Sequence, residues 1–189
     1  MSAAVHADAT AVLEAWDAPD PGQSAIREAL LAYLAGRPDA CSRSCASGHL
    51  TASALVVDDA GGHALLTLHP RVGRWLQLGG HIEPDDTTLR GAALREATEE
   101  SGIAGLTISD APMHLDVHPV TCSLGVPTRH LDVRYLVRAP AGAREIRSEE
   151  SVDLRWWALA ELPDDVAFGR ALLGAEARAR HLVAGATRV

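Results

Sequence analysis

The stretch that decides the fold begins Gly79-Gly80-His81-Ile82-Glu83-Pro84-Asp85-Asp86 and continues, after residues 87–94, as Arg95-Glu96-Ala97-Thr98-Glu99-Glu100-Ser101-Gly102-Ile103. A short strand is predicted before the two glycines, and a helix is predicted from about Thr87 to Ser101. On a helix that turns by about 100° per residue, Glu96, Glu99 and Glu100 lie on one face, because residues three and four apart are neighbours. Three like charges are therefore close together, and Gly102 is well placed for a left-handed cap.

The glutamate face has two interpretations, a solvated acidic helix surface or a metal site. The same side of the helix carries Leu89, Ala92 and Ala93, whereas the opposite side carries Arg90, Thr98 and Ser101. We therefore expect the carboxylates to be turned toward the body of the protein. Semi-buried carboxylates need a partner, and Mg²⁺ and Mn²⁺ prefer such oxygen ligands. The Gly79-Gly80 turn would let the backbone approach the helix closely.

Residues 80–103 resemble the signature box of the Nudix hydrolases, Gly-x5-Glu-x7-Arg-Glu-U-x-Glu-Glu-x-Gly-U, in which U is aliphatic. The second half, REATEESGI, matches except that the small Ala97 stands at the first aliphatic position. The first half departs from the pattern, because Asp86 replaces the glutamate and eight rather than seven residues separate it from Arg95. The role of Asp86 therefore stays open, with the helix N-cap as one option.

The resemblance implies an α/β fold, with a mixed β-sheet sandwiched between helices (α/β/α). It implies hydrolysis of a nucleoside diphosphate linked to another moiety, such as ADP-ribose, by attack of metal-activated water on phosphorus. Mg²⁺ or Mn²⁺ is then held by Glu96, Glu99 and Glu100, and the predicted catalytic residues are Glu99, Glu100 and Arg95, with Arg95 orienting Glu96. Substrate binding is predicted for Gly79, Gly80, His81, Glu83 and Arg134. An extra carboxylate for the site would come from Glu145, Glu149 or Glu150. An exposed charged loop without a catalytic role is an equally good interpretation of these residues.

Two other functions stay open. A nucleotide-sensing Nudix domain without catalysis would be favoured by loss of box glutamates, and none is lost from the predicted helix. Isopentenyl-diphosphate isomerases share the fold, but they have a degenerate box with a catalytic cysteine in the glycine loop. In this sequence residues 75–86, which include that loop, contain no cysteine. The metal-dependent hydrolase is therefore the favoured interpretation.

Outward from the box, residues 1–47 are predicted to form a helical extension and residues 48–189 the Nudix domain. Ile26, Leu30, Leu31 and Leu34 recur at helical spacing, and beyond Gly48 short strands take over. Strands are predicted at residues 49–58, 63–69, 74–78, 114–120, 130–138 and 152–158, with a last helix at about 166–183. The extension could cap the sheet, join two copies in a homodimer or cover the substrate.

Composition excludes several classes of function. All 17 basic residues are arginine, against 25 acidic residues, for a net charge of -8. Without lysine there is no Schiff-base catalysis, no pyridoxal phosphate anchor and no Gly-Lys-Ser/Thr phosphate loop. The acidic surface argues against a nucleic acid polymer as partner and leaves a small nucleotide diphosphate, bound through a cation. The sequence shows neither a secretory signal nor an apolar run of membrane length, so we expect a cytoplasmic protein.

Two weaker patterns involve histidine. His114, Asp116 and His118 alternate along one predicted strand, and His130, Asp132 and Arg134 along another, so that pairing of the strands would make one polar patch. This patch could bind a transition metal or phosphates, although a hydrated sheet face is the more ordinary interpretation. Cys41-x3-Cys45-x3-His49 resembles part of a zinc site, but free thiols are the favoured interpretation.

Overall fold

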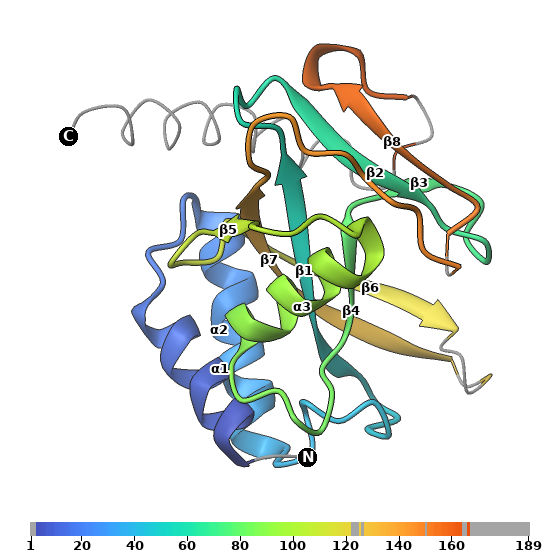
Figure 1. The fold of residues 1–189 in the computed structure, drawn as a ribbon. Helices are drawn as coiled ribbons and strands as arrows, with labels where there is room; N and C mark the ends of the chain where they lie inside the picture. Colours follow the sequence, from blue (N-terminus) through green and yellow to red (C-terminus); the bar gives the residue numbers. More distant parts are fainter. Residues whose placement is uncertain (1–2, 122–124, 126, 150, 164–165, 167–189) are drawn as a thin grey trace. The chain divides into compact units, whose positions relative to one another are not determined.

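The computed structural model describes residues 3–121, 125, 127–149, 151–163 and 166 (Figure 1). The elements in chain order are α1 (Ala3–Ala15), α2 (Pro21–Gly36), β1 (His49–Val57), β2 (His63–Leu68), β3 (Trp75–Leu76), β4 (Leu78–His81), α3 (Leu89–Ser101), β5 (Thr107–Ile108), β6 (His114–Thr121), β7 (Pro127–Arg138), β8 (Asp153–Ala158) and the 3-10 turn η1 (Leu159–Glu161). The hydrogen-bonded strand order is β3-β2-β1-β7-β5, with β4 on β1, β6 on β7 and β8 on β2. This is the predicted α/β architecture, preceded by two helices.

The chain divides into two compact units. The first comprises residues 1–53, 80–93 and 110–135, and the second comprises residues 54–79, 94–109 and 136–189. Four elements, β1, β4, β7 and α3, contribute residues to both units.

In the first unit, α1 and α2 lie side by side at the amino-terminal end of the chain (Figure 1). Helix α2 begins where the sequence predicts a breaker: the Asp20 side chain accepts the Gln23 N–H at 2.9 Å, and Pro21 occupies the first turn. The two helices bury apolar side chains at helical spacing: Val5, Ala9, Leu13, Leu30 and Leu34. They are therefore part of the core of this unit.

Gln23 joins α2 to strand β6. Its side-chain amide donates to the Leu115 carbonyl at 2.9 Å, and its oxygen accepts the Leu115 N–H at 2.7 Å. On its other side β6 pairs antiparallel with β7, with Leu115 opposite Val133. One buried glutamine thus satisfies both backbone groups of an edge-strand residue, which would otherwise be left unpaired.

The second unit is built around β2, which pairs antiparallel with β3 and β8 and, through Leu65 and Ala64, with the end of β1. Its core is made of small and aliphatic side chains, as the scarcity of aromatic residues requires. The buried cluster comprises Ala54, Val56, Leu65, Leu78, Ala97, Ile103, Val137, Ala139 and Leu154.

The structure corrects two sequence predictions and adds one short strand. The strand predicted at residues 74–78 is divided into β3 and the start of β4, and the two-residue strand β5 was not predicted. Ser101 is buried rather than exposed, because its hydroxyl donates to the Ala97 carbonyl and accepts the Ile103 N–H. The helix predicted at about 166–183 lies outside the described residues except for Val166. In the described part of the chain, none of the helices has the length and apolar character needed to cross a membrane.

Candidate active site

The N-cap of helix α3 is Thr88 and not Asp86, for which the sequence left this role as one option. The Thr88 carbonyl accepts the Ala92 N–H at 3.1 Å and its hydroxyl accepts the Gly91 N–H at 3.0 Å, so Thr88 is the N-cap. Asp86 instead accepts the Glu83 N–H at 2.7 Å and closes the preceding turn. Asp86 therefore belongs to the loop before the helix, and Thr88 supplies the N-cap of α3.

A second carboxylate reaches the start of α3 from far away in the sequence. Asp8 of α1 accepts the Leu89 N–H at 2.8 Å. The exposed donors of a first helical turn favour a negative charge, so this contact stabilises the start of α3.

The end of α3 depends on Gly102, as the sequence predicts. Its φ of 65° is left-handed, and its N–H donates to the Thr98 carbonyl at 2.9 Å. A Cβ at this position would lie 2.7 Å from the Cβ of Ile146. The Ile146 N–H donates to the Ser101 carbonyl at 2.7 Å, which leaves no room for a side chain on residue 102.

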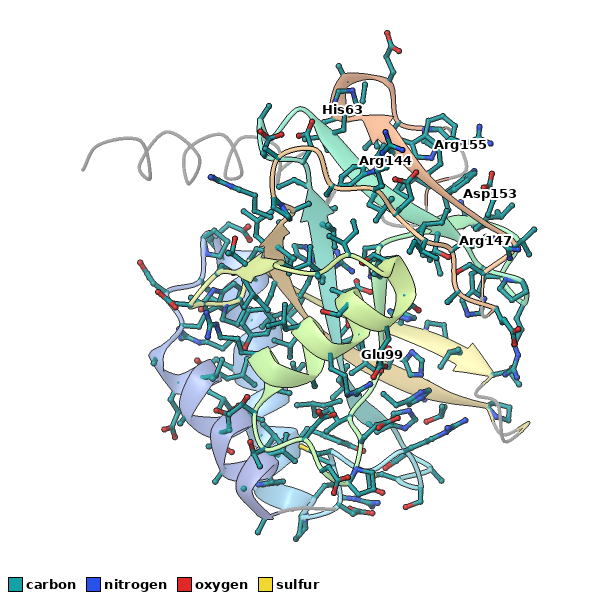
Figure 2. The ribbon with its side chains drawn as sticks, in the orientation of Figure 1. His63, Glu99, Arg144, Arg147, Asp153 and Arg155 are labelled. Atoms are coloured by element: carbon teal, nitrogen blue, oxygen red, sulfur yellow. The ribbon has the colours of Figure 1, made fainter. Side chains whose placement is uncertain are left out.

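Arg95 lies between two of the predicted metal-binding glutamates. Its Nη1 atom is 3.0 Å from Glu96 Oε1 and 3.0 Å from Glu99 Oε2. The Glu96 side chain is 13% exposed, whereas the Glu99 side chain is 59% exposed and projects from α3 in Figure 2. One guanidinium therefore offsets the repulsion between these two carboxylates.

Glu100 is held by the glycine turn. Its Oε2 atom accepts the Gly79 N–H at 3.1 Å, and its side chain is half-buried. Gly79 has a φ of 145°, a conformation that favours glycine. The close approach of backbone to helix that the sequence predicts is thus present in the second unit.

The three carboxylates do not form a tight cage in this structure. In the described part of the chain, the only group of three or more metal-ligating side chains whose donor atoms all lie within 4.8 Å of one another is a group of histidines. The carboxylates bond to Arg95 and Gly79 instead. Their oxygens remain on one helix face and still match the chemistry of a hard divalent cation.

The candidates for an extra carboxylate have different positions. Glu145 accepts a hydrogen bond from Trp156 Nε1 at 2.8 Å, which holds it against β8. Glu149 is exposed, and Glu150 lies outside the described residues. In Figure 2 the labelled side chains other than Glu99 gather around β2 and β8, where Arg155 lies over Trp75 and Trp157 at 5.6 Å.

Arg134, a predicted substrate-binding residue, is 1% exposed. Its Nη2 atom is 3.0 Å from Asp132 Oδ2, and Asp132 also accepts hydrogen bonds from Thr51 at 3.0 Å and Ser53 at 2.6 Å. These contacts join the first-unit parts of β1 and β7. The structure therefore gives Arg134 a buried contact within the sheet, and its binding of substrate stays a prediction.

The predicted polar patch forms, because β6 and β7 pair antiparallel. The register places His114 opposite Arg134, Asp116 opposite Asp132 and His118 opposite His130. His118 Nδ1 lies 2.7 Å from Asp116 Oδ2. Burial alone would raise the pKa of Asp116, but the hydrogen bond with His118 and the charges of His118, Arg134 and His114 together hold that pKa below its usual value.

The sequence did not reveal a cluster of three histidines, one of which, His130, belongs to this polar patch. His49 begins β1, His81 ends β4 and His130 lies on β7, and their donor atoms all lie within 4.8 Å of one another. Burial lowers the pKa of His81 to about 4 and of His130 to about 3, with the neighbouring imidazoles adding to the shift, and burial also lowers the pKa of His49. All three rings are therefore neutral at pH 7.

The cysteines near this group are free thiols. Cys41 and Cys45 are both buried. Cys45 Sγ lies 3.1 Å from Arg37 Nη2 and 3.3 Å from the Tyr33 hydroxyl. The backbone carbonyl of Cys45 lies next to His49, and among the described residues neither sulfur belongs to a group of metal-ligating side chains, in agreement with the free thiols favoured from the sequence.

A cleft of about 280 Å³ lies elsewhere in the second unit, lined by residues that include Asp58, His63, Pro140 and Trp156. Among the described residues, its lining contains none of the predicted catalytic side chains. We therefore do not place the chemistry in this cleft.

The NUDIX domain family model matches residues 48–176. This chain belongs to the Nudix family. It is accordingly a hydrolase that acts on pyrophosphate bonds, and the family typically uses divalent metals. A comparison with curated proteins found no match.

Solved structures share the fold. A NUDIX-family hydrolase from Clostridium perfringens is 24% identical, with a TM-score of 0.57 over 71% of this chain and 97% of that chain. An Ap4A hydrolase binary complex from C. elegans is 22% identical, with a TM-score of 0.51 over 72% and 98%. The NUDIX domain of Shewanella oneidensis NrtR, solved with ADP ribose, is 25% identical, with a TM-score of 0.51 over 70% and 87%.

Proposed function

We propose that this Nudix domain cleaves an ADP-ribose-like molecule, a nucleoside diphosphate linked to a further sugar moiety. The observation that carries the proposal is the end of α3, where Glu100 is half-buried and held by Gly79, one turn away from Glu96 and Arg95. The ADP ribose in the NrtR NUDIX domain supports this choice of substrate class.

Glu96, Glu99 and Glu100 would hold Mg²⁺ or Mn²⁺, because carboxylate oxygens are the ligands that these ions prefer. When bound, the metal supplies charge neutralisation at the diphosphate and a more acidic water. Arg95 holds Glu96 and Glu99 in position, and the Gly79 N–H fixes one oxygen of Glu100. Attack of water on phosphorus then breaks the P–O–P anhydride and leaves one phosphate on each product.

The test compares a substrate panel in the presence of Mg²⁺ or Mn²⁺, with products separated by chromatography. ADP-ribose, nucleotide sugars, dinucleoside polyphosphates, coenzyme A and nucleoside triphosphates should be included. We expect ADP-ribose to give AMP and ribose 5-phosphate, and we expect it to have the highest kcat/KM.

The first prediction concerns Glu100. Glu100→Gln keeps a hydrogen-bond acceptor for Gly79 but removes the charge, so we expect kcat to fall by about 100-fold or more while the thermal unfolding midpoint stays close to that of the wild type. Glu14→Gln, an exposed change on α1, is the matched control and should leave turnover unchanged. Unchanged kinetics in Glu100→Gln would contradict the assignment of this residue.

The same experiment tests the non-catalytic alternative. Calorimetric binding of ADP-ribose without product, in the presence of either metal, would show a nucleotide-sensing domain. The wild type could instead cleave a different substrate, such as a dinucleoside polyphosphate, with the same loss of kcat in Glu100→Gln. That result would support the assignment of Glu100 and change only the proposed substrate class.

A further inference from the structure

Three histidines from distant parts of the sequence meet inside the first unit. The ring centroids of His49 and His81 are 5.1 Å apart, those of His49 and His130 are 5.1 Å apart, and those of His81 and His130 are 5.2 Å apart. One nitrogen from each ring lies within 4.8 Å of the others. The three rings thus bring three nitrogen donors close together.

The polar atoms of this cluster are incompletely satisfied by the protein. His49 is 1% exposed, and its Nδ1 lies 3.4 Å from the Cys45 carbonyl, which selects the tautomer whose Nε2 carries the lone pair. In the described part of the chain, the buried Nε2 atoms of His49 and His130 have no hydrogen-bond partner. A buried nitrogen without a partner costs free energy, and a metal ion would remove that cost.

The surroundings match those of metal-binding histidines. A ligating imidazole usually directs its second nitrogen to a backbone carbonyl or a carboxylate, as His49 does toward Cys45. His118 packs against His130 with centroids 5.5 Å apart and is itself held by Asp116. Asp132, two residues after His130, is engaged by Thr51, Ser53 and Arg134 and does not compete for the ion.

We propose that His49, His81 and His130 bind one transition-metal ion, with Zn²⁺ as the ion that best fits three imidazoles, and with a fourth position for water or a phosphate oxygen. Imidazole nitrogen suits Zn²⁺, Co²⁺ and similar ions, whereas Mg²⁺ and Mn²⁺ prefer oxygen. Zn–N bonds of about 2.0–2.1 Å in a tetrahedral site place the nitrogens about 3.4 Å apart. Small rotations of the rings would bring the nitrogens from their present spacing to that separation.

This site is chemically separate from the glutamates of α3, and the proposal does not rest on the hydrolytic function. Its ligands belong to β1, β4 and β7, and the ion that it selects differs from the one that the glutamates favour. Activity is therefore not the readout of the test.

The test uses the full chain without an affinity tag of histidines, stripped of metal with a chelator and titrated with Zn²⁺ or Co²⁺. We expect one ion per chain by elemental analysis. Bound Co²⁺ should give the visible absorption of a tetrahedral site without a sulfur-to-cobalt charge-transfer band. An intense charge-transfer band would assign the ion to cysteine and overturn the proposal.

Substitutions then assign the ligands. His81→Gln and His130→Gln, both at half-buried positions, should each weaken Co²⁺ binding by more than about 10-fold. Mutation of a residue that only supports a metal ligand already weakens binding by about 10-fold or more, so loss of a ligand should cost at least as much. His63→Gln, at an exposed histidine paired with Asp58, is the matched control. Circular dichroism of each variant should remain that of the wild type, which separates loss of a ligand from loss of the fold.

A last variant separates this proposal from the previous one. Glu100→Gln should bind Zn²⁺ and Co²⁺ as tightly as the wild type even though it loses turnover. Absence of stoichiometric binding in the wild type, or equal binding in His81→Gln, His130→Gln and the wild type, would overturn the histidine site.

Discussion

At the scale of single residues, Asp132 shows how the first unit tolerates charge in its interior. The residue is 3% exposed, and its two carboxylate oxygens accept hydrogen bonds from Thr51, Ser53 and Arg134. Removing two charges from water is costly, and the cost is offset only when the geometry and the hydrogen bonds are complete. The network therefore fixes the position of β7 against β1 in this unit.

We expect Asp132→Asn to lower the free energy of unfolding by about 3 kcal/mol, because it removes the carboxylate charge that pairs with the buried guanidinium of Arg134. Urea unfolding followed by tryptophan fluorescence measures the change. The matched control is Asp153→Asn, which breaks the exposed pair with Arg155 and should cost less than about 1 kcal/mol. Equal losses of unfolding free energy in the two variants would show that the buried pair contributes no more stability than the exposed pair.

Cys41 gives the protein a predictable response to alkaline pH. Burial, with a smaller contribution from the charge of Asp8, raises the pKa of this thiol from 9.0 to about 11. Above pH 9 the unfolded chain loses this proton while the folded chain keeps it. The unfolded state then binds fewer protons, so the free energy of unfolding falls as the pH rises from 9 to 11. Burial raises the pKa of Tyr135 as well, which acts in the same direction.

The measurement is urea unfolding between pH 8 and pH 11. The wild type should be most stable at the lower end of this range, and Cys41→Ala should lose less stability across it than the wild type does. If the two proteins lose the same amount, Cys41 does not carry the effect.

At the scale of elements, α3 is positioned by contacts at its ends as much as by its own sequence. Thr88 and Asp8 satisfy its first donors, and Gly102 ends it beneath Ile146. Because the glutamates occupy the middle and last turns, a shift of either end would move them. The conformation of Gly102 is therefore tied to the geometry of the proposed metal ligands.

Gly102→Ala and Gly73→Ala separate two penalties. Both glycines have a φ of 65°, but a Cβ on residue 73 would meet no atom within 4 Å, whereas a Cβ on residue 102 would lie 2.7 Å from Ile146 Cβ. We expect Gly73→Ala to cost about 1 kcal/mol from backbone strain alone, and Gly102→Ala to cost about 1–3 kcal/mol more from the clash. Thermal unfolding of the two variants compares them directly. Equal costs would mean that Ile146 moves aside freely.

At the scale of the whole molecule, the two amino-terminal helices are part of the first unit. They contribute buried side chains to it, and the segment that contains them bonds to later parts of the chain: Asp8 of α1 to Leu89, Trp16 of the connecting loop to Pro112 and Gln23 of α2 to Leu115. The similar structures align with about 70% of this chain and with nearly all of their own. The boundary predicted at residues 47 and 48 remains a prediction, and it can be tested by truncation.

We expect a chain of residues 48–189 to unfold at lower urea concentration than the full chain and to aggregate, because its first unit would expose the apolar surface that α1 and α2 cover. Equilibrium urea unfolding and light scattering are the measurements. A gentler control is Gln23→Ala in the full chain, which should destabilise by about 1–3 kcal/mol through the unpaired Leu115 groups. A truncated chain as stable as the full one would show that the extension is an independent addition.

The sequence by itself determined the family, the acidic face of α3, its left-handed cap and most strands, because each is a pattern within one short segment. Periodicity and spacing also anticipated that β6 and β7 align their polar residues. Only the tertiary structure brought His49, His81 and His130 together, placed Asp8 at the start of α3 and buried Arg134 against Asp132. The histidine and Asp8 contacts join residues about 30 to 80 positions apart. Arg134 and Asp132 are near neighbours on one strand, but the burial of their pair depends on how that strand packs in the sheet. Local pattern carries no information on which distant side chains meet when strands pair and helices pack.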